Sequence, residues 1–193
     1  MKTLELEQPR ITRHRLSAEQ YQRMGEAGVF EPDARVELIG GEVIDMAPIG
    51  TRHAATVKRL AQALFQAVAG RAIVSVQDPI RLDVQSESEP DLAVLEPRDD
   101  FYASALPAGH DALLVIEVAD SSVAYDLLRK ARLYALHGVP ANWVVDIGAG
   151  RLHTLAAPQG GVYTVAEVTA SPGIVAWPGR ADTVIDLRDL FHR

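Results

Sequence analysis

The chain has 193 residues, of which 48% are hydrophobic and 23% charged, so it can bury a core and lacks the composition of a disordered chain. It contains no cysteine, which excludes disulfides, cysteine metal sites and thiol nucleophiles. The formal net charge of -7 argues against non-specific binding of nucleic acid, although a local basic face or a bound metal can offset the acids of a site.

No segment approaches the roughly 18 apolar residues of a membrane helix. The first ten residues, MKTLELEQPR, lack the apolar core of a secretory signal. We therefore expect a soluble, cytoplasmic protein with no membrane partner. The length suits one domain, with the polar residues 1–15 as an N-terminal arm and residues 16–193 as a single domain.

The chain after the arm predicts a short helix and a hairpin. Ser17 is suited to cap a helix over residues 16–28. Two short apolar runs surround Gly40-Gly41, which predicts a hairpin over residues 35–46 because paired glycines favour tight turns.

The next segment predicts a long helix followed by two strands. Apolar residues recur at helical spacing over 51–70, where Thr51 is suited to cap the helix and Gly70 to end it. Strands are predicted over 72–84, with a break at Asp78-Pro79.

The middle of the chain alternates polar and strongly apolar stretches. The sequence SESE over 86–89 predicts a polar turn before a strand over 91–95. Residues 96–111 predict a long loop with room for a short helical turn. Residues 112–118, ALLVIEV, form the most apolar strand and are the best candidate for a central strand covered on both faces.

The last third predicts a second strong helix over 121–138, which Ser121 or Ser122 starts and Gly138 ends. Further strands are predicted over 142–147, 151–157 and 161–168, with a final strand and short helix over 183–191. This order of elements predicts an α/β domain with a mixed sheet flanked by helices.

Glu117 lies inside the most apolar predicted strand. A buried, charged and unpaired glutamate would cost several kcal/mol, so its surroundings must supply a cation, a proton or a metal. The alternative is a half-exposed acid at the end of the strand, paired with an arginine.

Asp91 follows Pro90 at the start of another predicted strand. The proline favours an extended path into the sheet, although aspartate after proline is also common in turns. Two acids on neighbouring strands are more informative, because Mg²⁺ and Mn²⁺ prefer oxygen ligands. Such an ion can polarise a phosphoryl oxygen and generate a hydroxide nucleophile.

The helix after Glu117 carries Asp126 and Lys130 four residues apart, hence on one face, which Tyr134 extends. An ordinary surface ion pair is one explanation. The functional hypothesis is that Lys130 leans toward the acids, where it could position or deprotonate a water and stabilise a pentavalent phosphorus. Arg129 and Arg132 could contact phosphates, but a solvated helix face is the preferred explanation for them.

These residues resemble a known group of enzymes. Pro90-Asp91 followed by Ile116-Glu117-Val118 resembles the PD-(D/E)XK nuclease superfamily, and roughly residues 16–157 resemble the Uma2 (DUF820-like) family of restriction-type endonucleases. The most specific stretch is VIEVADSSVAYDLLRKARLYALHGVPANWVVD, because the shorter motifs match many proteins by chance. The resemblance implies a restriction-endonuclease-like core, Mg²⁺ or Mn²⁺ as cofactor, and hydrolysis of phosphodiester bonds in DNA.

One position departs from the superfamily pattern, which places a lysine two residues after the second acid, where this chain has Ala119. The resemblance implies that Lys130 replaces it from the following helix, with Asp126 holding Lys130 in place. The other lysines are Lys2, in the predicted arm, and Lys58, on another helix.

The resemblance also implies that Glu37 joins Asp91 and Glu117 as a metal ligand, although Glu37 alone could be an exposed strand residue. His53 begins the first long predicted helix. It could contact the scissile phosphate or a metal-bound water, or it could only cap and pack. Gln77 is a weaker candidate from the same region.

Three functional hypotheses follow. The first is a metal-dependent endonuclease with Glu37, Asp91, Glu117, Lys130 and assisting His53 at its site. The second is a catalytically inactive module on the same fold that binds nucleic acid or protein, which the acidic total and the missing in-strand lysine favour. The third is a metal-dependent hydrolase of a small phosphate ester. A homodimer is expected from symmetry alone, because cleavage of two strands calls for two sites.

Overall fold

The computed structural model describes residues 12–177 and 180–191 of the chain. Of the predicted N-terminal arm, residues 1–11 lie outside the described residues. No helix of the described part is long and apolar enough to cross a membrane. The first half contains α1 (Ala18–Glu26), β1 (Val36–Ile39), β2 (Glu42–Asp45), α2 (Thr51–Val68), β3 (Ile73–Val76), β4 (Ile80–Asp83), β5 (Ser86–Ser88) and β6 (Leu92–Leu95).

The second half begins with a long loop that ends in a short 3-10 turn (Gly109–Asp111), as the sequence predicted. One helix then runs through α3 (Val123–Tyr125), a π-helical turn (Asp126–Lys130) and α4 (Ala131–Leu136). The strands of this half are β7 (Ala112–Ala119), β8 (Ala141–Asp146), β9 (Arg151–Gln159), β10 (Val162–Ala170), β11 (Ile174–Trp177) and β12 (Arg180–Asp186).

The strands of the described residues form a large sheet and two smaller ones. The large sheet has the order β10-β9-β8-β7-β6-β3, and the four-stranded small sheet has the order β2-β1-β5-β4. Strands β11 and β12 form a separate pair. In the large sheet β7 and β8 are parallel and the other pairs are antiparallel, so the predicted mixed sheet is confirmed. The helix from α3 to α4 makes the crossover that a parallel pair requires.

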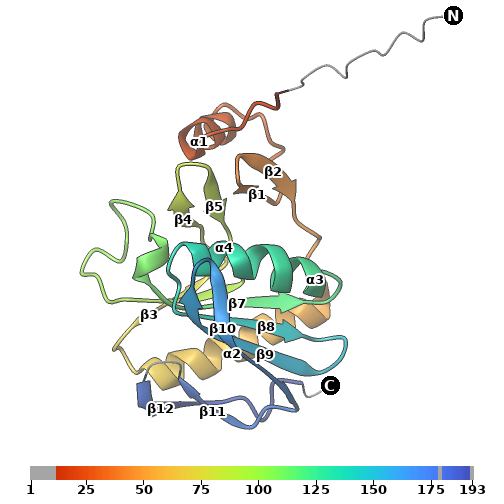
Figure 1. Cartoon of the computed structure of the whole chain (residues 1–193), viewed down its shortest axis with the longest axis vertical. Helices are drawn as coiled ribbons and strands as arrows, with labels where there is room; N and C mark the ends of the chain where they lie inside the picture. The colour runs from red at the N-terminus through yellow and green to blue at the C-terminus, as the bar shows by residue number, and fades with distance from the viewer. Residues whose placement is uncertain (1–11, 178–179, 192–193) are drawn as a thin grey trace, which may run out of the picture.

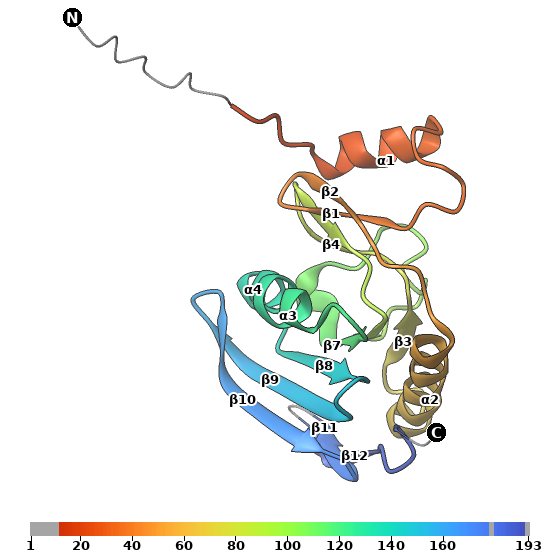
Figure 2. The same ribbon diagram turned by 90° about the vertical axis from the view of Figure 1, so that its right-hand side faces the viewer.

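Helices cover the large sheet on both sides, with α2 on one and the α3–α4 helix on the other (Figures 1 and 2). The alternation of side chains along β7 explains which residues meet which helix. Leu114, Ile116 and Val118 belong to the core cluster that includes α2. Val115 belongs to the cluster that includes Tyr134 of α4. Glu117, two residues after Val115, therefore faces the α3–α4 helix, which brings Lys130 within its reach.

The two predicted long helices and the hairpin are confirmed. Ser17 caps α1 with a complete capping box, in which it accepts a hydrogen bond from the backbone N–H of Gln20. The predicted cap of α2 is wrong by one residue, because Gly50 is the cap and Thr51 is already helical. The helix ends through Ala69 in the left-handed conformation, with φ of 47°, directly before Gly70.

The prediction of a turn over 86–89 is wrong. Ser86–Ser88 form the buried strand β5, which pairs with β1 and β4. Its polar side chains have partners inside the protein: Ser86 Oγ accepts a hydrogen bond from the N–H of Gly40, and Glu87 pairs with Arg81. The polar residues of this segment therefore form hydrogen bonds inside the protein and are not exposed to solvent. Strand β11 was also missed, and β12 is followed by turns instead of the predicted short helix.

Candidate active site

A cleft of about 460 Å³ lies at the carboxyl end of β7, between the β1–β2 hairpin, the start of α2 and the start of α3. Its lining includes the six main site residues that the sequence predicted, Glu37, His53, Asp91, Glu117, Asp126 and Lys130, but not the weaker candidate Gln77. Glu37, His53 and Asp91 lie far in the chain from the other three residues, so the fold brings the two groups to one place.

The pairing of β6 with β7 brings Asp91 beside Glu117. Leu92 lies opposite Ile116 in the register, so the residue before β6 meets the residues after Ile116. The backbone N–H of Val118 donates a hydrogen bond of 2.9 Å to Oδ2 of Asp91. The two acids therefore stand at the same edge of the sheet, as the strand pattern predicted.

Two further side chains hold Asp91 in the cleft. His53 Nε2 lies 3.0 Å from Oδ2 of Asp91, and Gln77 donates a hydrogen bond of 3.1 Å to Oδ1. Burial opposes ionisation of Asp91, but the contacts from His53, Val118 and Gln77 outweigh it and hold the pKa of the carboxyl below its usual range. Asp91 is therefore an anion at neutral pH.

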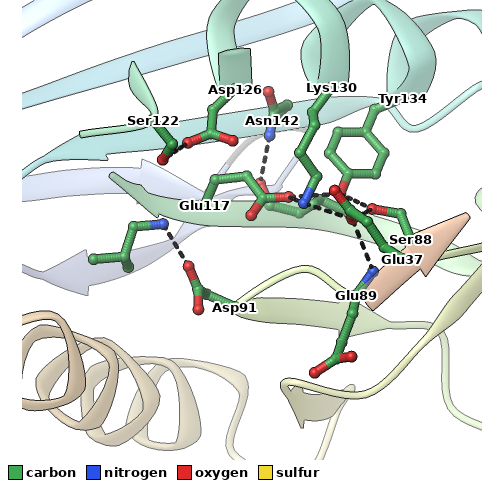
Figure 3. Close-up of polar contacts among 12 residues, drawn as sticks. Glu37, Ser88, Glu89, Asp91, Glu117, Ser122, Asp126, Lys130, Tyr134 and Asn142 are labelled. Atoms are coloured by element: carbon green, nitrogen blue, oxygen red, sulfur yellow. Dashed lines mark hydrogen bonds and ion pairs between the residues drawn. The ribbon is translucent and has the colours of Figure 1, made fainter. Parts of the chain in front are cut away.

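Lys130 lies between Glu117 and Glu37. Its Nζ is 2.9 Å from Oε1 of Glu117 and 3.1 Å from Oε2 of Glu37, and only 2% of the residue is exposed. Figure 3 shows the lysine extending from its helix to these two acids. Burial disfavours its charge, yet Glu117, Tyr134 and Glu37 raise the pKa of Lys130 well above its ordinary value. Lys130 is therefore a buried cation, in contact with Glu117 but not with Asp91.

Glu117 is 4% exposed, so the sequence-based alternative of a half-exposed acid paired with an arginine is wrong. Burial raises the pKa of Glu117 to about 8, although Lys130 acts in the opposite direction. Glu37 is buried as well, which excludes the alternative of an exposed strand residue. Both acids depend on the surrounding polar groups for their solvation.

A second connection between Glu117 and Glu37 passes through two hydroxyl groups. Tyr134 Oη donates a hydrogen bond of 2.6 Å to Oε1 of Glu117, and Ser88 Oγ donates one of 3.0 Å to Oε2 of Glu37. The two hydroxyl oxygens are 2.9 Å apart. The three contacts, Glu117 to Tyr134, Tyr134 to Ser88 and Ser88 to Glu37, each need one proton, but the two hydroxyl groups supply only two. The third proton would be on one of the two acids, which fits the raised pKa of Glu117.

Asp126 does not contact Lys130 as the helix spacing predicted. Its Oδ2 accepts a hydrogen bond of 2.6 Å from Ser122, while the ion-pair partners of Lys130 in the described part of the chain are Glu37 and Glu117. Asp126 and Lys130 both lie in a π-helical turn, so the regular α-helix that the spacing assumed is not formed here. Burial raises the pKa of Asp126.

Tyr125 and Ser88 were not singled out as site residues. Tyr125 lines the cleft, and its Oη is buried with no hydrogen-bond partner among the described residues. Burial, followed by the charge of Glu37, raises the pKa of Tyr125 to about 12. An unpaired buried hydroxyl beside a cleft is a natural contact for a bound polar group. The one feature of the sequence that could have identified Tyr125 is its position in the stretch that most specifically resembles the family.

The donor set suits a hard divalent cation, with Asp91 and Glu117 as the two acids that fit best. No group of three His, Asp or Glu side chains in the described residues is already gathered for a metal. Magnesium, however, is commonly held by one or two carboxylates with water completing its shell. Asp91 Oδ1 accepts one hydrogen bond in the described structure and has capacity for another ligand. Glu37 is engaged with Lys130 and Ser88, so its role as a metal ligand stays a prediction.

The charge of the cleft also bears on what it can bind. Six acidic side chains line it against two basic ones, Arg35 and Lys130. Both Glu37 and Glu117 already share the charge of Lys130. A phosphate would be repelled by such a lining unless a cation entered with it.

A family model described as "Uma2: Putative restriction endonuclease" matches residues 18–178. Among solved structures, the chain is similar to the crystal structure of a "putative nuclease belonging to DUF820" from Anabaena variabilis ATCC 29413. The TM-score is 0.66 at 17% sequence identity, and the match covers 91% of this chain and 97% of that chain. A search of curated proteins gives no match. At this identity the structural likeness shows a common fold.

Proposed function

The chain belongs to the Uma2 family, as its motifs predicted, and from that premise we propose that it is a metal-dependent endonuclease acting on DNA. The observation that carries the proposal is the convergence of Asp91, Glu117 and Lys130 in one cleft. The reaction is hydrolysis of a phosphodiester: a water oxygen bonds to phosphorus and the bridging P–O bond breaks. One proton of the water ends on the leaving oxygen, which gives a phosphomonoester and an alcohol.

Mg²⁺ or Mn²⁺ held by Asp91 and Glu117 would supply Lewis-acid polarisation of a phosphoryl oxygen. Glu37 is the third proposed ligand, for which its contact with Lys130 would have to loosen. His53 supports Asp91 through their 3.0 Å contact, and we assign it to holding that carboxylate in place beside the phosphate. Asp126 would accept the hydrogen bond of Ser122 and so hold the Ser122 side chain in place at the cleft.

We propose that Lys130 acts as a positively charged group rather than as the base that accepts a proton. Its raised pKa means that it is protonated at neutral pH in the metal-free protein, so it cannot accept a proton there. A protonated amine can orient the attacking water and stabilise the negative charge that develops on phosphorus oxygens. Glu117 and Glu37 fix its position from two sides.

Plasmid nicking tests this proposal. Supercoiled DNA incubated with Mg²⁺ or Mn²⁺ should be nicked by the wild type, and Lys130→Ala should remove the activity. Lys58→Ala is the matched control, because Lys58 is an exposed helical lysine that lines neither this cleft nor any other described cavity. Nicking by a folded Lys130→Ala variant at the wild-type rate would overturn the role of Lys130.

Calorimetric titration tests the metal separately from the chemistry. Mn²⁺ should release or absorb heat with the wild type, and Asp91→Asn and Glu117→Gln should abolish that signal. Circular dichroism of each variant shows whether it is folded. Absence of Mn²⁺ binding to the wild type would contradict metal dependence for DNA and for any smaller substrate.

A hydrolase of a small phosphate ester is the second candidate, because a cleft of about 460 Å³ lies within the range of small-molecule sites. Bis(p-nitrophenyl) phosphate and p-nitrophenyl phosphate separate the two proposals. Hydrolysis of the monoester together with no nicking of any DNA would favour the small-ester enzyme.

We also propose that the protein is a cytoplasmic homodimer, since two sites are needed to cut two strands. Among the described strands, the long edge strand β10 pairs with β9 alone, and its other edge is available for antiparallel pairing with a second copy. Light scattering on the purified protein would give the mass: a monomer at micromolar concentration would contradict the dimer.

A further inference from the structure

A second cavity, of about 740 Å³, lies on the opposite side of the start of α2 from the acidic cleft. One of its walls is a face of α2 that carries Arg52 and Arg59, and another is the turn at residues 147–150 after β8. None of the residues that line it is acidic. Its lining therefore has the charge sign opposite to that of the candidate active site.

The two cavities are neighbours along one edge of the large sheet. Strand β7 ends at the acidic cleft, and the parallel strand β8 ends at the second cavity, where the N–H of Ile147 donates to the carbonyl of Ala119. Arg52 stands between them: it donates a hydrogen bond of 2.7 Å to the carbonyl of Ile147 and lies 4.0 Å from Asp120 at the rim of the cleft. Figure 2 shows α2 running along this side of the sheet.

Arg59 is the more informative of the two arginines. It is partly buried along the wall, and no hydrogen bond or ion pair joins it to another of the described residues. Arg52 and Arg59 are seven residues apart on α2, so they project from the same face two turns apart. A guanidinium without a carboxylate partner in a cavity without acids is arranged for an anion from outside.

The start of α2 adds to the positive potential. Its cap is Gly50, which contributes no side-chain hydrogen bond, and its first turn has no acidic residue. The backbone N–H groups of this turn therefore keep their partial positive charge for an anion. Together with the two arginines, they place positive charge beside the rim of the acidic cleft, where Asp120 lies 4.0 Å from Arg52, and in the wall of the second cavity.

We propose that this second cavity, defined by Arg52, Arg59 and the turn at 147–150, binds the phosphodiester backbone of a nucleic acid beside the scissile position. The inference rests on the proposed nuclease function and deepens it, since it says where the substrate strand runs. The strand crosses the start of α2, with one phosphate at the carboxylates of the cleft and its neighbours at Arg52 and Arg59. Phosphates next to the scissile one thus meet cations, whereas the scissile one meets acids that need a metal.

Fluorescence anisotropy of a short labelled duplex DNA, measured in EDTA, tests the inference without any cleavage step. We expect Arg59→Ala to weaken binding roughly fivefold near 0.1 M salt, and to reduce the slope of log affinity against log salt by about 0.9 for one lost phosphate contact. Arg59→Lys should restore most of the slope. Lys58→Ala removes the same charge from the adjacent exposed position of α2 and should leave affinity and slope unchanged.

The outcomes separate this inference from the proposed function. Equal affinities of the wild type, Arg59→Ala and Lys58→Ala would overturn it, as would a wild type that binds no nucleic acid in EDTA. Nicking of plasmid DNA in the presence of a metal could still stand in both cases. Weakening by Arg59→Ala alone would uphold it even for a protein that cuts nothing. Single-stranded DNA and RNA probes in the same assay identify which nucleic acid supplies the backbone.

Discussion

Lys130 is held inside the protein by its contacts with Glu37 and Glu117, instead of by solvent. A buried pair of this kind does not by itself stabilise a protein, because desolvation of the charges offsets much of their attraction. Removing the lysine alone would leave two acids facing each other without a cation. The arrangement is more informative about the site than about the stability of the fold.

The raised pKa of Glu117 predicts how stability depends on pH. Because the folded protein holds this proton up to about pH 8 and the unfolded chain releases it near its ordinary value of 4.5, the free energy of unfolding should fall as pH rises through that window. Glu117→Gln removes this contribution. Urea denaturation in EDTA at several pH values from about 5 to 8 should give a flatter profile for the variant than for the wild type. Parallel profiles would contradict the prediction.

Tyr134→Phe tests the hydroxyl chain between the two acids. It deletes the hydrogen-bond partner of the buried Glu117 and of Ser88, and leaving a buried polar group without a partner costs about 1–3 kcal/mol. Tyr21→Phe is the control, since Tyr21 donates to the neutral carbonyl of Val36 at a partly buried position, where the loss should be about 1 kcal/mol. Chemical denaturation of both variants measures the difference. An equal loss at the two positions would argue against a special role of the chain.

The sequence was sufficient to find the three main residues of the candidate site. Acids at the edges of apolar strands are costly and therefore informative, and the scarcity of lysine directed attention to Lys130. The sequence was not sufficient to identify the residues that contact these three. The pairing of Ser88 with Glu37 and of Gln77 with Asp91 depends on how two distant strands meet, and no local pattern marks a serine as buried.

At the scale of elements, the π-helical turn Asp126–Lys130 determines where Lys130 points. A π turn contains one residue more than an α-helical turn, so every side chain before it is rotated relative to those after it. Tyr134 packs after the turn and Ser122 lies before it. The helical periodicity of the sequence predicted the helix correctly but assumed a regular α-helix, and the Asp126–Lys130 pair that it predicted was wrong: Asp126 contacts Ser122, and Lys130 contacts Glu37 and Glu117.

Deleting Leu128 tests the turn, because this residue is 74% exposed and its removal would allow a regular α-helix. We expect the deletion to displace Lys130 from Glu117 and to reduce nicking by about a hundredfold or more, as a misplacement of about 1 Å can. Leu128→Ala keeps the length of the helix and should change stability by no more than about 0.5 kcal/mol. Full activity in the deletion variant would show that the extra residue is dispensable.

Strand β5 illustrates the other error in predicting elements. The sequence SESE has low strand propensity and no apolar residue, which is typical of turns. It is nevertheless buried because Arg81, Glu37 and the backbone of Gly40 satisfy its polar groups. Patterns of apolar residues report contacts with a hydrophobic core, whereas β5 is fixed by polar contacts with the hairpin and the site.

For the whole molecule, metal binding should appear as stabilisation. A cation that binds only the folded protein adds about 2.7 kcal/mol at 100 times its dissociation constant. Mg²⁺ or Mn²⁺ should therefore raise the melting temperature of the wild type but not of Asp91→Asn. Asp99→Asn removes the same charge from an exposed loop and should respond as the wild type does. Sodium chloride at the same ionic strength is the control for charge screening. An equal rise of the melting temperature in all three proteins would contradict a specific site.

The candidate site also joins the two main sheets. Glu37 and Ser88 belong to the small sheet, while Glu117 is in the large sheet and Asp91 directly precedes one of its strands. The large sheet packs on α2 through one hydrophobic cluster that does not include the small sheet, and Ile80 and Leu82 of β4 join the small sheet to it through a second, smaller cluster. Local opening of the small sheet would therefore dismantle the site while the large sheet stays folded, so amide hydrogens of β1 should exchange with solvent sooner than those of β7. Opening of the small sheet, and with it of the candidate site, would then cost less free energy than unfolding of the whole protein.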